Sequence, residues 1–154
     1  MFSCKKTDNN SAVTQVDFYI LSDSNASDRY RLACRIADKA HAAGRRVVIH
    51  TGSAEEAKHV NRLLWTFQEQ SFIPHGLLGQ CETEITPVLV GNAEQAHEEH
   101  DVLINLAMEV PTFFSRFDRL AECVDNEEVA RTASRERYRF YRDRGYPLSL
   151  HDIA

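Results

Sequence analysis

Short apolar runs spaced along the whole chain give the first indication of its secondary structure. They are rich in β-branched and aromatic residues, and RVVIHT has the continuous apolar centre that is typical of a strand buried on both faces. Pro74 limits the length of one run. The runs predicted to be strands are residues 16–21, 46–51, 71–75, 87–91, 101–107 and 119–125.

Between these runs, apolar residues recur at helical spacing. One helix is predicted over 27–44, where Gly44 closes it. A second begins at the capping-box sequence SAEE (53–56) and ends near Phe67. PTFFSRF (111–117) predicts a short helix with proline in its first turn.

This order of strands and helices predicts an α/β fold. We expect a single-domain, three-layer sandwich with a mainly parallel sheet and a Rossmann-like topology. Neither GxGxxG nor GxxxxGK[ST] occurs, so the fold is expected to lack a phosphate-binding loop. Residues 1–13 are polar and predict a flexible tail, which leaves 14–154 as the domain.

The composition is that of an ordinary soluble protein, with 43% apolar and 27% charged residues. No apolar run reaches membrane-spanning length, and no apolar leader begins the chain, so we expect a cytoplasmic protein without membrane contacts. The cysteines lie far apart in sequence and are expected to be free thiols. They are Cys4, Cys34, Cys81 and Cys123.

No set of catalytic residues, cofactor site or metal site is recognisable by spacing. His97 and His100 could share a helical face, but a metal site would need a third ligand, so a solvated acidic loop is the simpler interpretation. The sequence HTGSAEE (50–56) could hold an anion at a helix N-terminus, although a capping box explains the same residues.

The last helix carries a stripe of side chains that are nearly all positively charged. It is predicted to begin at Asp125 or Asn126 and to run to Gly145. At about 100° per residue, four arginines and a tyrosine fall on one side. The residues of this stripe are Arg131, Arg135, Tyr138, Arg139 and Arg142.

The opposite side of that helix is expected to bury Val129, Ala133 and Phe140, with Arg137 and Arg144 flanking the buried face. Like charges at helical spacing cost about 0.2–0.5 kcal/mol per pair. A solvated face usually mixes signs, so a stripe that costs stability indicates an acidic ligand.

The remainder of the chain is acidic. Residues 131–145 hold six arginines against two acids, so the overall net charge of −5 leaves −9 elsewhere. This balance argues against direct nucleic-acid binding of high affinity, which needs many cations to neutralise phosphates. Trp65 lies off the apolar stripe of its helix and is either partly exposed or tucked beneath 71–75.

Three stretches also carry a family resemblance: LLWTFQEQSFIPHG (63–76), DVLINLA (101–107) and RERYRFYRDRGY (135–146). With them, roughly residues 16–146 resemble the chi subunit of bacterial DNA polymerase III holoenzyme. The N-terminal extension and QCETEITP (80–87) depart from the family pattern.

The resemblance implies a non-catalytic accessory subunit with no cofactor. Its implied partners are the small psi subunit, the clamp loader through psi, and the acidic C-terminal tail of single-stranded DNA-binding protein, which ends in phenylalanine. We expect the psi contact to be an apolar patch away from the arginines, with 111–117 as one candidate. The implied tail-binding residues are Trp65, Phe72, Val124, Arg131, Arg135, Tyr138, Arg139 and Arg142.

A small α/β enzyme is the alternative to this interpretation. Its arginines would bind a phosphorylated or carboxylate substrate, and a perturbed histidine in a cleft near Arg135 would support it.

Overall fold

The computed structural model describes residues 13–68 and 72–154. In them a single sheet runs in the order β3-β4-β2-β5-β6-β1-β7, and all neighbouring strands are parallel. The predicted α/β fold with a mainly parallel sheet is therefore confirmed. The strands are β1 (Gln15–Leu21), β2 (Val47–His50), β3 (His75–Leu77), β4 (Val88–Gly91), β5 (Val102–Asn105), β6 (Arg119–Val124) and β7 (Leu148–Ile153).

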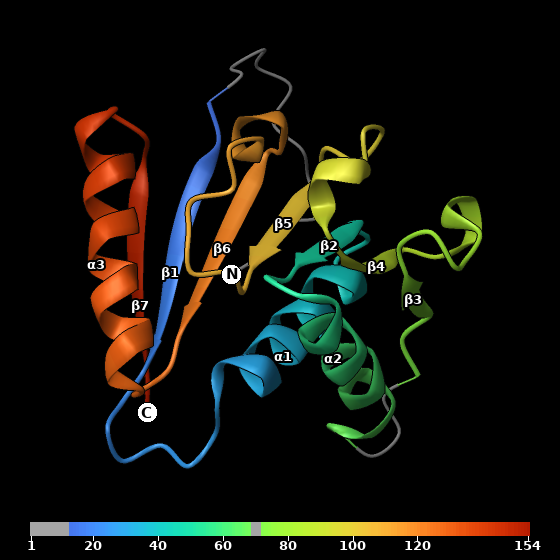
Figure 1. Cartoon of the computed structure of the whole chain (residues 1–154), viewed down its shortest axis with the longest axis horizontal. Coiled ribbons are helices and arrows are strands. Elements are labelled where there is room, and N and C mark those ends of the chain that lie inside the picture. Colours follow the sequence, from blue (N-terminus) through green and yellow to red (C-terminus); the bar gives the residue numbers. More distant parts are fainter. Residues whose placement is uncertain (1–12, 69–71) are drawn as a thin grey trace.

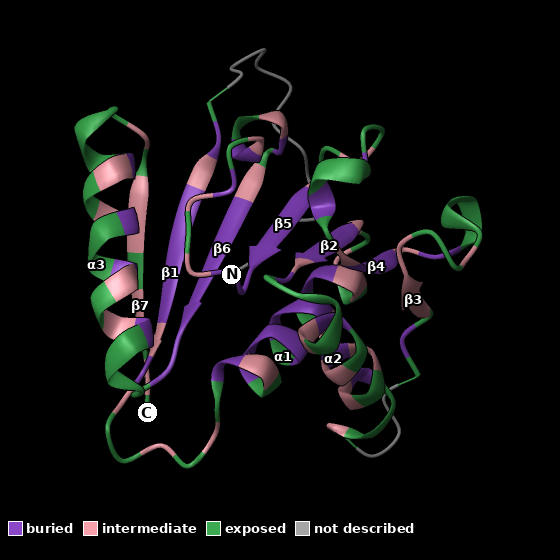
Figure 2. Ribbon diagram, viewed as in Figure 1, coloured by how far each residue is buried: buried purple, intermediate pink, exposed green. Residues whose placement is uncertain are grey.

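Helices cover both faces of this sheet, which gives the three predicted layers. α1 and α2 pack on one face and α3 on the other (Figure 1). The strands between them are mostly buried, whereas the outer side of α3 is exposed (Figure 2). The helices are α1 (Arg29–Ala42), α2 (Ala54–Thr66) and α3 (Glu128–Asp143), with 3₁₀ turns η1 (Thr83–Ile85), η2 (Ala93–Gln95) and η3 (Phe114–Arg116).

Two strand predictions need correction. The strand expected at 71–75 instead spans His75–Leu77, because the proline ring of Pro74 leaves no N–H for a sheet and so confines the strand to the residues after it. β7 was not predicted, and it lies at the sheet edge, where its residues are half-buried or exposed. The segment 111–117 forms only the short 3₁₀ turn η3.

The predicted buried face of α3 is wrong. Val129 is 67% exposed, and the helix is rotated so that Ala130, Ser134, Arg137 and Tyr141 point into the core. The prediction placed Arg137 beside the buried face, whereas its side chain lies within that face and is 5% exposed. A charged side chain can be buried where it pairs with a side chain of opposite charge, and β6 supplies such a partner.

Thr14, near the start of the described residues, is fully buried, and its hydroxyl donates to the Phe117 carbonyl at 2.6 Å. The predicted flexible tail at 1–13 lies outside the described residues except for Val13. In the described part of the chain, no helix has the length and apolar character needed to cross a membrane.

Candidate functional site

The outward side of α3 carries the predicted arginine stripe. Arg135, Arg139 and Arg142 are exposed, while Arg131 and Tyr138 are half-buried. The Tyr138 ring meets the Phe18 ring of β1 edge-on, with 5.5 Å between ring centroids, so this flank of the helix lies over β1. We call the set the arginine face; it comprises Arg131, Arg135, Tyr138, Arg139 and Arg142.

Two of these arginines pair with acids of their own helix. Arg139 contacts Glu136 at 2.7 Å, and Arg142 contacts Asp143 at 3.1 Å. All four side chains are more than half exposed, and such pairs contribute only about 0–1 kcal/mol. The Arg135 side chain makes no hydrogen bond or ion pair with any described residue. Carboxylates of a ligand could therefore bind Arg135 directly. They could also compete with Glu136 and Asp143 for Arg139 and Arg142.

Arg131 is held at the N-terminal end of this face. Its guanidinium donates to the backbone carbonyls of Asp125 (3.2 Å) and Leu21 (3.0 Å), and it pairs with the exposed Asp23 at 2.9 Å. Beside it lies a hollow of about 420 Å³. The hollow is lined by Ile20, Leu21, Ser22, Asp23, Arg131, Asp152, Ile153 and Ala154.

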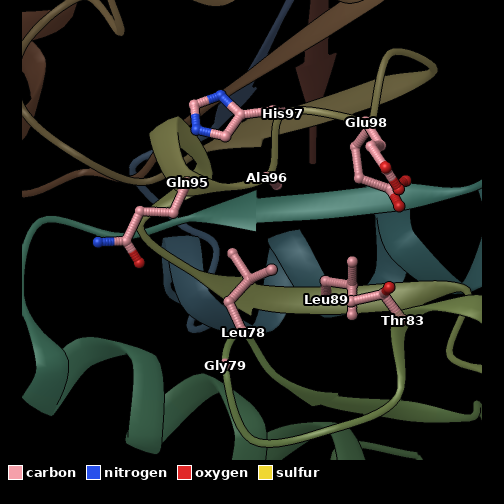
Figure 3. Close-up of a pocket in the computed structure, with 9 residues that line it drawn as sticks. Leu78, Gly79, Thr83, Leu89, Gln95, Ala96, His97 and Glu98 are labelled. Carbon is pink, nitrogen blue, oxygen red and sulfur yellow. The ribbon is translucent and has the colours of Figure 1, made fainter.

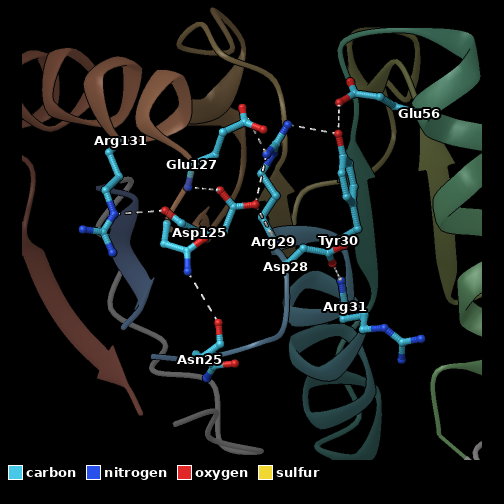
Figure 4. A network of polar contacts seen from close by, with 10 residues as sticks. Asn25, Asp28, Arg29, Tyr30, Arg31, Glu56, Asp125, Glu127 and Arg131 are labelled. Carbon is cyan, nitrogen blue, oxygen red and sulfur yellow. Dashed lines mark hydrogen bonds and ion pairs between the residues drawn. The ribbon is translucent and has the colours of Figure 1, made fainter. Parts of the chain in front are cut away.

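A buried carboxylate fixes the start of α3. Asp125 Oδ2 accepts from the backbone N–H and the guanidinium of Arg29, at 3.1 and 3.0 Å, and Oδ1 accepts from the Glu127 N–H at 3.2 Å (Figure 4). The expected N-cap at Asp125 or Asn126 is thus displaced to Glu127, although the Asp125 carboxylate still satisfies its N–H. The network joins α3 to the start of α1.

Val124 does not line the hollow. It is buried on the α3 side of the sheet and lies opposite Ile20 in the ladder between β6 and β1. Ile20, its neighbour in that ladder, lines the hollow instead.

Trp65 and Phe72 lie elsewhere on the molecule. Trp65 is 65% exposed and Phe72 is 82% exposed, so of the two alternatives left open for Trp65 the structure shows the exposed one. The Trp65 ring contacts the His75 ring of β3, with centroids 4.6 Å apart. Because α2 and α3 cover opposite faces and β3 is the edge farthest from β7, the structure does not bring this pair to the arginine face.

Comparison with known proteins settles the family. The model of the family described as "DNA polymerase III chi subunit, HolC" matches residues 13–149. The chain belongs to this chi family. A "DNA polymerase III subunit chi" from Pseudomonas aeruginosa is 40% identical over 141 residues, covering 92% of this chain and 98% of that protein. The corresponding proteins of Haemophilus influenzae and Escherichia coli are 29% and 28% identical, covering 89% and 86% of this chain and 96% and 93% of theirs.

A likeness among solved structures concerns the fold alone. The crystal structure of T4 UvsW is 7% identical, with a TM-score of 0.66 over 92% of this chain and 42% of that one. Such low identity says nothing about a shared activity.

In this chi-family chain, side chains of the protein itself occupy the possible anion site before α2. The Ser53 hydroxyl accepts from the Glu56 N–H at 3.1 Å, and Glu56 Oε1 accepts from the Gly52 N–H at 2.9 Å. The other Glu56 oxygen accepts from the Tyr30 hydroxyl at 2.5 Å (Figure 4). A carboxylate already occupies the helix N-terminus, which favours the capping box over an anion site.

His50, at the end of β2, is the histidine with a perturbed environment. Burial lowers its pKa, and its Nδ1 accepts from the Ala93 N–H at 3.0 Å. A hollow of about 290 Å³ beside it also contains Glu94 and Glu109. Two strands, β5 and β6, lie between β2 and β1, so this histidine is not near Arg135 and does not support the enzyme alternative.

The burial of His50 should make the domain less stable in acid. Its folded pKa lies below the unfolded value, so the unfolded chain binds more protons and stability falls as pH drops below about 6.5. We expect His50→Gln to lose less unfolding free energy than the parent chain between about pH 7 and about pH 5. Urea titrations at both pH values measure this, and equal losses in the two proteins would refute it.

The acidic loop at 97–100 follows the 3₁₀ turn η2. His97 and His100 are exposed, and no group of three metal-ligating side chains occurs among the described residues. The neighbouring hollow, of about 370 Å³, has Leu78 and Leu89 among its apolar walls (Figure 3). Three strands separate β4 from β1, so this hollow is not part of the arginine face.

Sequence analysis missed the part of the site that β7 contributes. Asp152 and Ile153 line the hollow beside Arg131. The signal was present as the partial alternation of LSLHDI (148–153), in which apolar residues at 148 and 150 face one side.

Proposed function

We propose that this chi-family chain is a non-catalytic accessory subunit that links two partners. Through the small psi subunit it connects to the clamp loader, and through the arginine face it binds the acidic C-terminal tail of single-stranded DNA-binding protein. The family assignment supports a role in DNA replication within the polymerase III holoenzyme. The exposed Arg135, whose side chain has no partner among the described residues and which is set among further arginines, is the observation that carries the tail site.

The chemistry of the arginine face suits such a tail. A guanidinium can bond both oxygens of one carboxylate, and these charge-assisted bonds are among the stronger ones in proteins. The Arg131 partner Asp23 is 85% exposed, so an incoming carboxylate can displace it. Ile20 and Ile153 give the adjacent hollow apolar walls for the phenyl ring of the last residue.

The second interface is proposed to be the exposed pair Trp65 and Phe72. Within 111–117, the candidate from sequence, Phe114 and Phe117 are 5% and 2% exposed and so offer little apolar surface. Exposed aromatic residues are typical anchors of protein interfaces. We assign Trp65 and Phe72 to psi rather than to the tail, because they lie at the far edge of the sheet from the arginine face.

Linking the two interfaces would raise the local concentration of the loader on coated template. Each tail contact can be weak, since several tails are presented together and a second contact is then intramolecular. The acidic remainder of the chain keeps bare single-stranded DNA from competing for the arginines.

Titration with a short acidic peptide ending in phenylalanine tests the tail site. We expect amidation of the peptide terminus to weaken binding by at least about tenfold, since one charge-assisted hydrogen bond contributes about 1.5–3 kcal/mol. Arg135→Ala should weaken binding by a similar factor without unfolding, and added salt should weaken it further. Arg35→Ala, which removes an exposed arginine from α1 on the opposite face, is the matched control. Equal affinity for the free and amidated peptides would exclude a site that reads the terminal carboxylate.

A further inference from the structure

β7 is an edge strand with one open side. Among the described residues it pairs with β1 alone. In this ladder Leu148 lies opposite Val16, and the Val16 N–H donates to the Pro147 carbonyl at 3.0 Å. Backbone groups alternate in direction along a parallel strand. The N–H and C=O groups of Leu148, Leu150 and Asp152 therefore point away from β1.

This edge has little of the usual protection. Its six residues include no proline or lysine, and its register with β1 is continuous from Val16 to Leu21. Its acidic residue is Asp152, which is exposed near the end of the strand. Natural sheets generally block exposed edges with proline, with charged side chains, especially lysine, or with bulges. Leu150, at the centre of the strand, is 57% exposed. β7 thus has the features of a strand that accepts another beside it.

The open edge adjoins the arginine face. Leu150 lies opposite Phe18 in the ladder, and Phe18 is the ring that Tyr138 contacts. Asp152 lines the same hollow as Arg131. Along α3 the eleven-residue step from Arg131 to Arg142 spans about 16 Å, and the six residues of β7 span about 20 Å, so the two surfaces match in length.

We propose that the acidic peptide binds as an added strand on the open edge of β7, with its alternate carboxylates directed at the arginine face. This mode rests on the proposed function and specifies how the same site holds its ligand. Main-chain bonds to Leu148, Leu150 and Asp152 would supply affinity that does not depend on peptide sequence. Side chains of a strand alternate between faces, so every second peptide residue would meet an arginine.

Charge selects this occupant over a second copy of the chain. Antiparallel pairing of two β7 strands in one continuous sheet would place both α3 helices on the same face. Two arginine faces would then lie side by side, and like charges across an interface disfavour association. An acidic peptide would bring negative charge to the arginine face, so attraction replaces repulsion and the peptide is the better match.

Removing one outward N–H tests the added strand. Leu150→Pro deletes the N–H that points away from β1 and keeps the ladder to β1, since proline is tolerated on the open side of an edge strand. Leu150→Ala keeps the N–H and measures the contribution of the side chain. We expect Leu150→Pro to bind the acidic peptide at least about fivefold more weakly than Leu150→Ala, with unchanged urea midpoints. Equal affinities of the two folded variants would overturn the added strand.

Peptides carrying N-methyl groups on alternate amides give a second readout that does not depend on folding. Methylation of one alternate set should weaken binding strongly, and methylation of the other set should be tolerated, because only one set faces β7. If Arg135→Ala weakens binding but both methylated peptides bind like the parent, the tail site stands and the added strand fails. If Arg135→Ala has no effect, the proposed tail site itself fails. Dimerisation that Leu150→Pro abolishes would assign the edge to a second copy instead.

Discussion

Arg137→Ala is expected to lower the free energy of unfolding by about 3–5 kcal/mol, the typical cost of breaking a buried ion pair. Arg137 is 5% exposed and its Nε lies 2.9 Å from Glu122, which is fully buried. The Tyr141 hydroxyl donates to the same carboxylate at 2.6 Å, and Asn105 donates to both of its oxygens at 3.1 Å. Without Arg137, the buried Glu122 carboxylate would keep only the neutral hydrogen-bond donors of Tyr141 and Asn105.

Equilibrium urea unfolding measures this loss, and Arg139→Ala is the matched control. Arg139 lies on the same helix, but its pair with Glu136 is exposed, so its removal should cost about 0.5 kcal/mol or less. Pairing Arg137→Met with Glu122→Leu should recover much of the stability, because no charge is then left buried. Similar losses for Arg137→Ala and Arg139→Ala would show that the buried pair contributes no more than an exposed one.

The same variant should show a pH signature. Burial raises the pKa of the Glu122 carboxyl, and Arg137 opposes that shift. In Arg137→Ala the opposition is lost and the pKa rises further. A group with a raised folded pKa loses stability as pH increases through that pKa. The deficit of Arg137→Ala relative to the parent should therefore be smaller in acid than at neutral pH.

Phe72→Ala is expected to weaken psi binding by about 30-fold or more, as is typical when an aromatic anchor is truncated. Phe72 is 82% exposed, so the change should leave the unfolding midpoint unaltered. Binding of the acidic peptide should persist, because the arginine face lies at the other edge of the sheet. Isothermal titration of each variant with psi and with the peptide measures both effects.

The reciprocal variant completes this test. Arg135→Ala should weaken binding of the peptide and retain psi, and Trp65→Ala should resemble Phe72→Ala. If Phe72→Ala weakened the peptide as much as psi, the two interfaces would not be separate. Ile85→Ala is a suitable control, since Ile85 is 72% exposed and belongs to η1, outside both surfaces.

The central strands were predictable because their environment is uniform. β2, β4 and β5 are buried on both faces, so their sequences are short, nearly continuous apolar runs rich in β-branched residues. β7 was not predicted because an edge strand does not need a continuous apolar run. Leu148 and Leu150 alternate with polar residues, and neither is fully buried.

The orientation of α3 could not be read from its sequence, because a helical wheel ranks arginine as a solvent residue. Glu122 was needed to show that Arg137 is buried, and that acid comes from β6, fifteen residues earlier. The arginine face was still predicted, since Arg135, Arg139 and Arg142 stay exposed under either rotation.

The grouping of Trp65 with Arg135 failed for a topological reason. Motifs along a chain do not specify which face of a sheet each helix covers. That assignment follows from the strand order and the right-handed crossovers between parallel strands. Because β3 and β7 end up at opposite edges, residues joined by a family resemblance are separated by the whole sheet.

That separation has a mechanical consequence. Six inter-strand gaps of about 4.8 Å put the two sheet edges about 29 Å apart, across a hydrogen-bonded slab that resists bending. Such a slab acts as a rigid spacer. Both ligands could be bound at once with additive binding free energies. A force applied at one edge of the sheet would be transmitted to the other edge through the sheet itself, with no flexible segment between them to unfold.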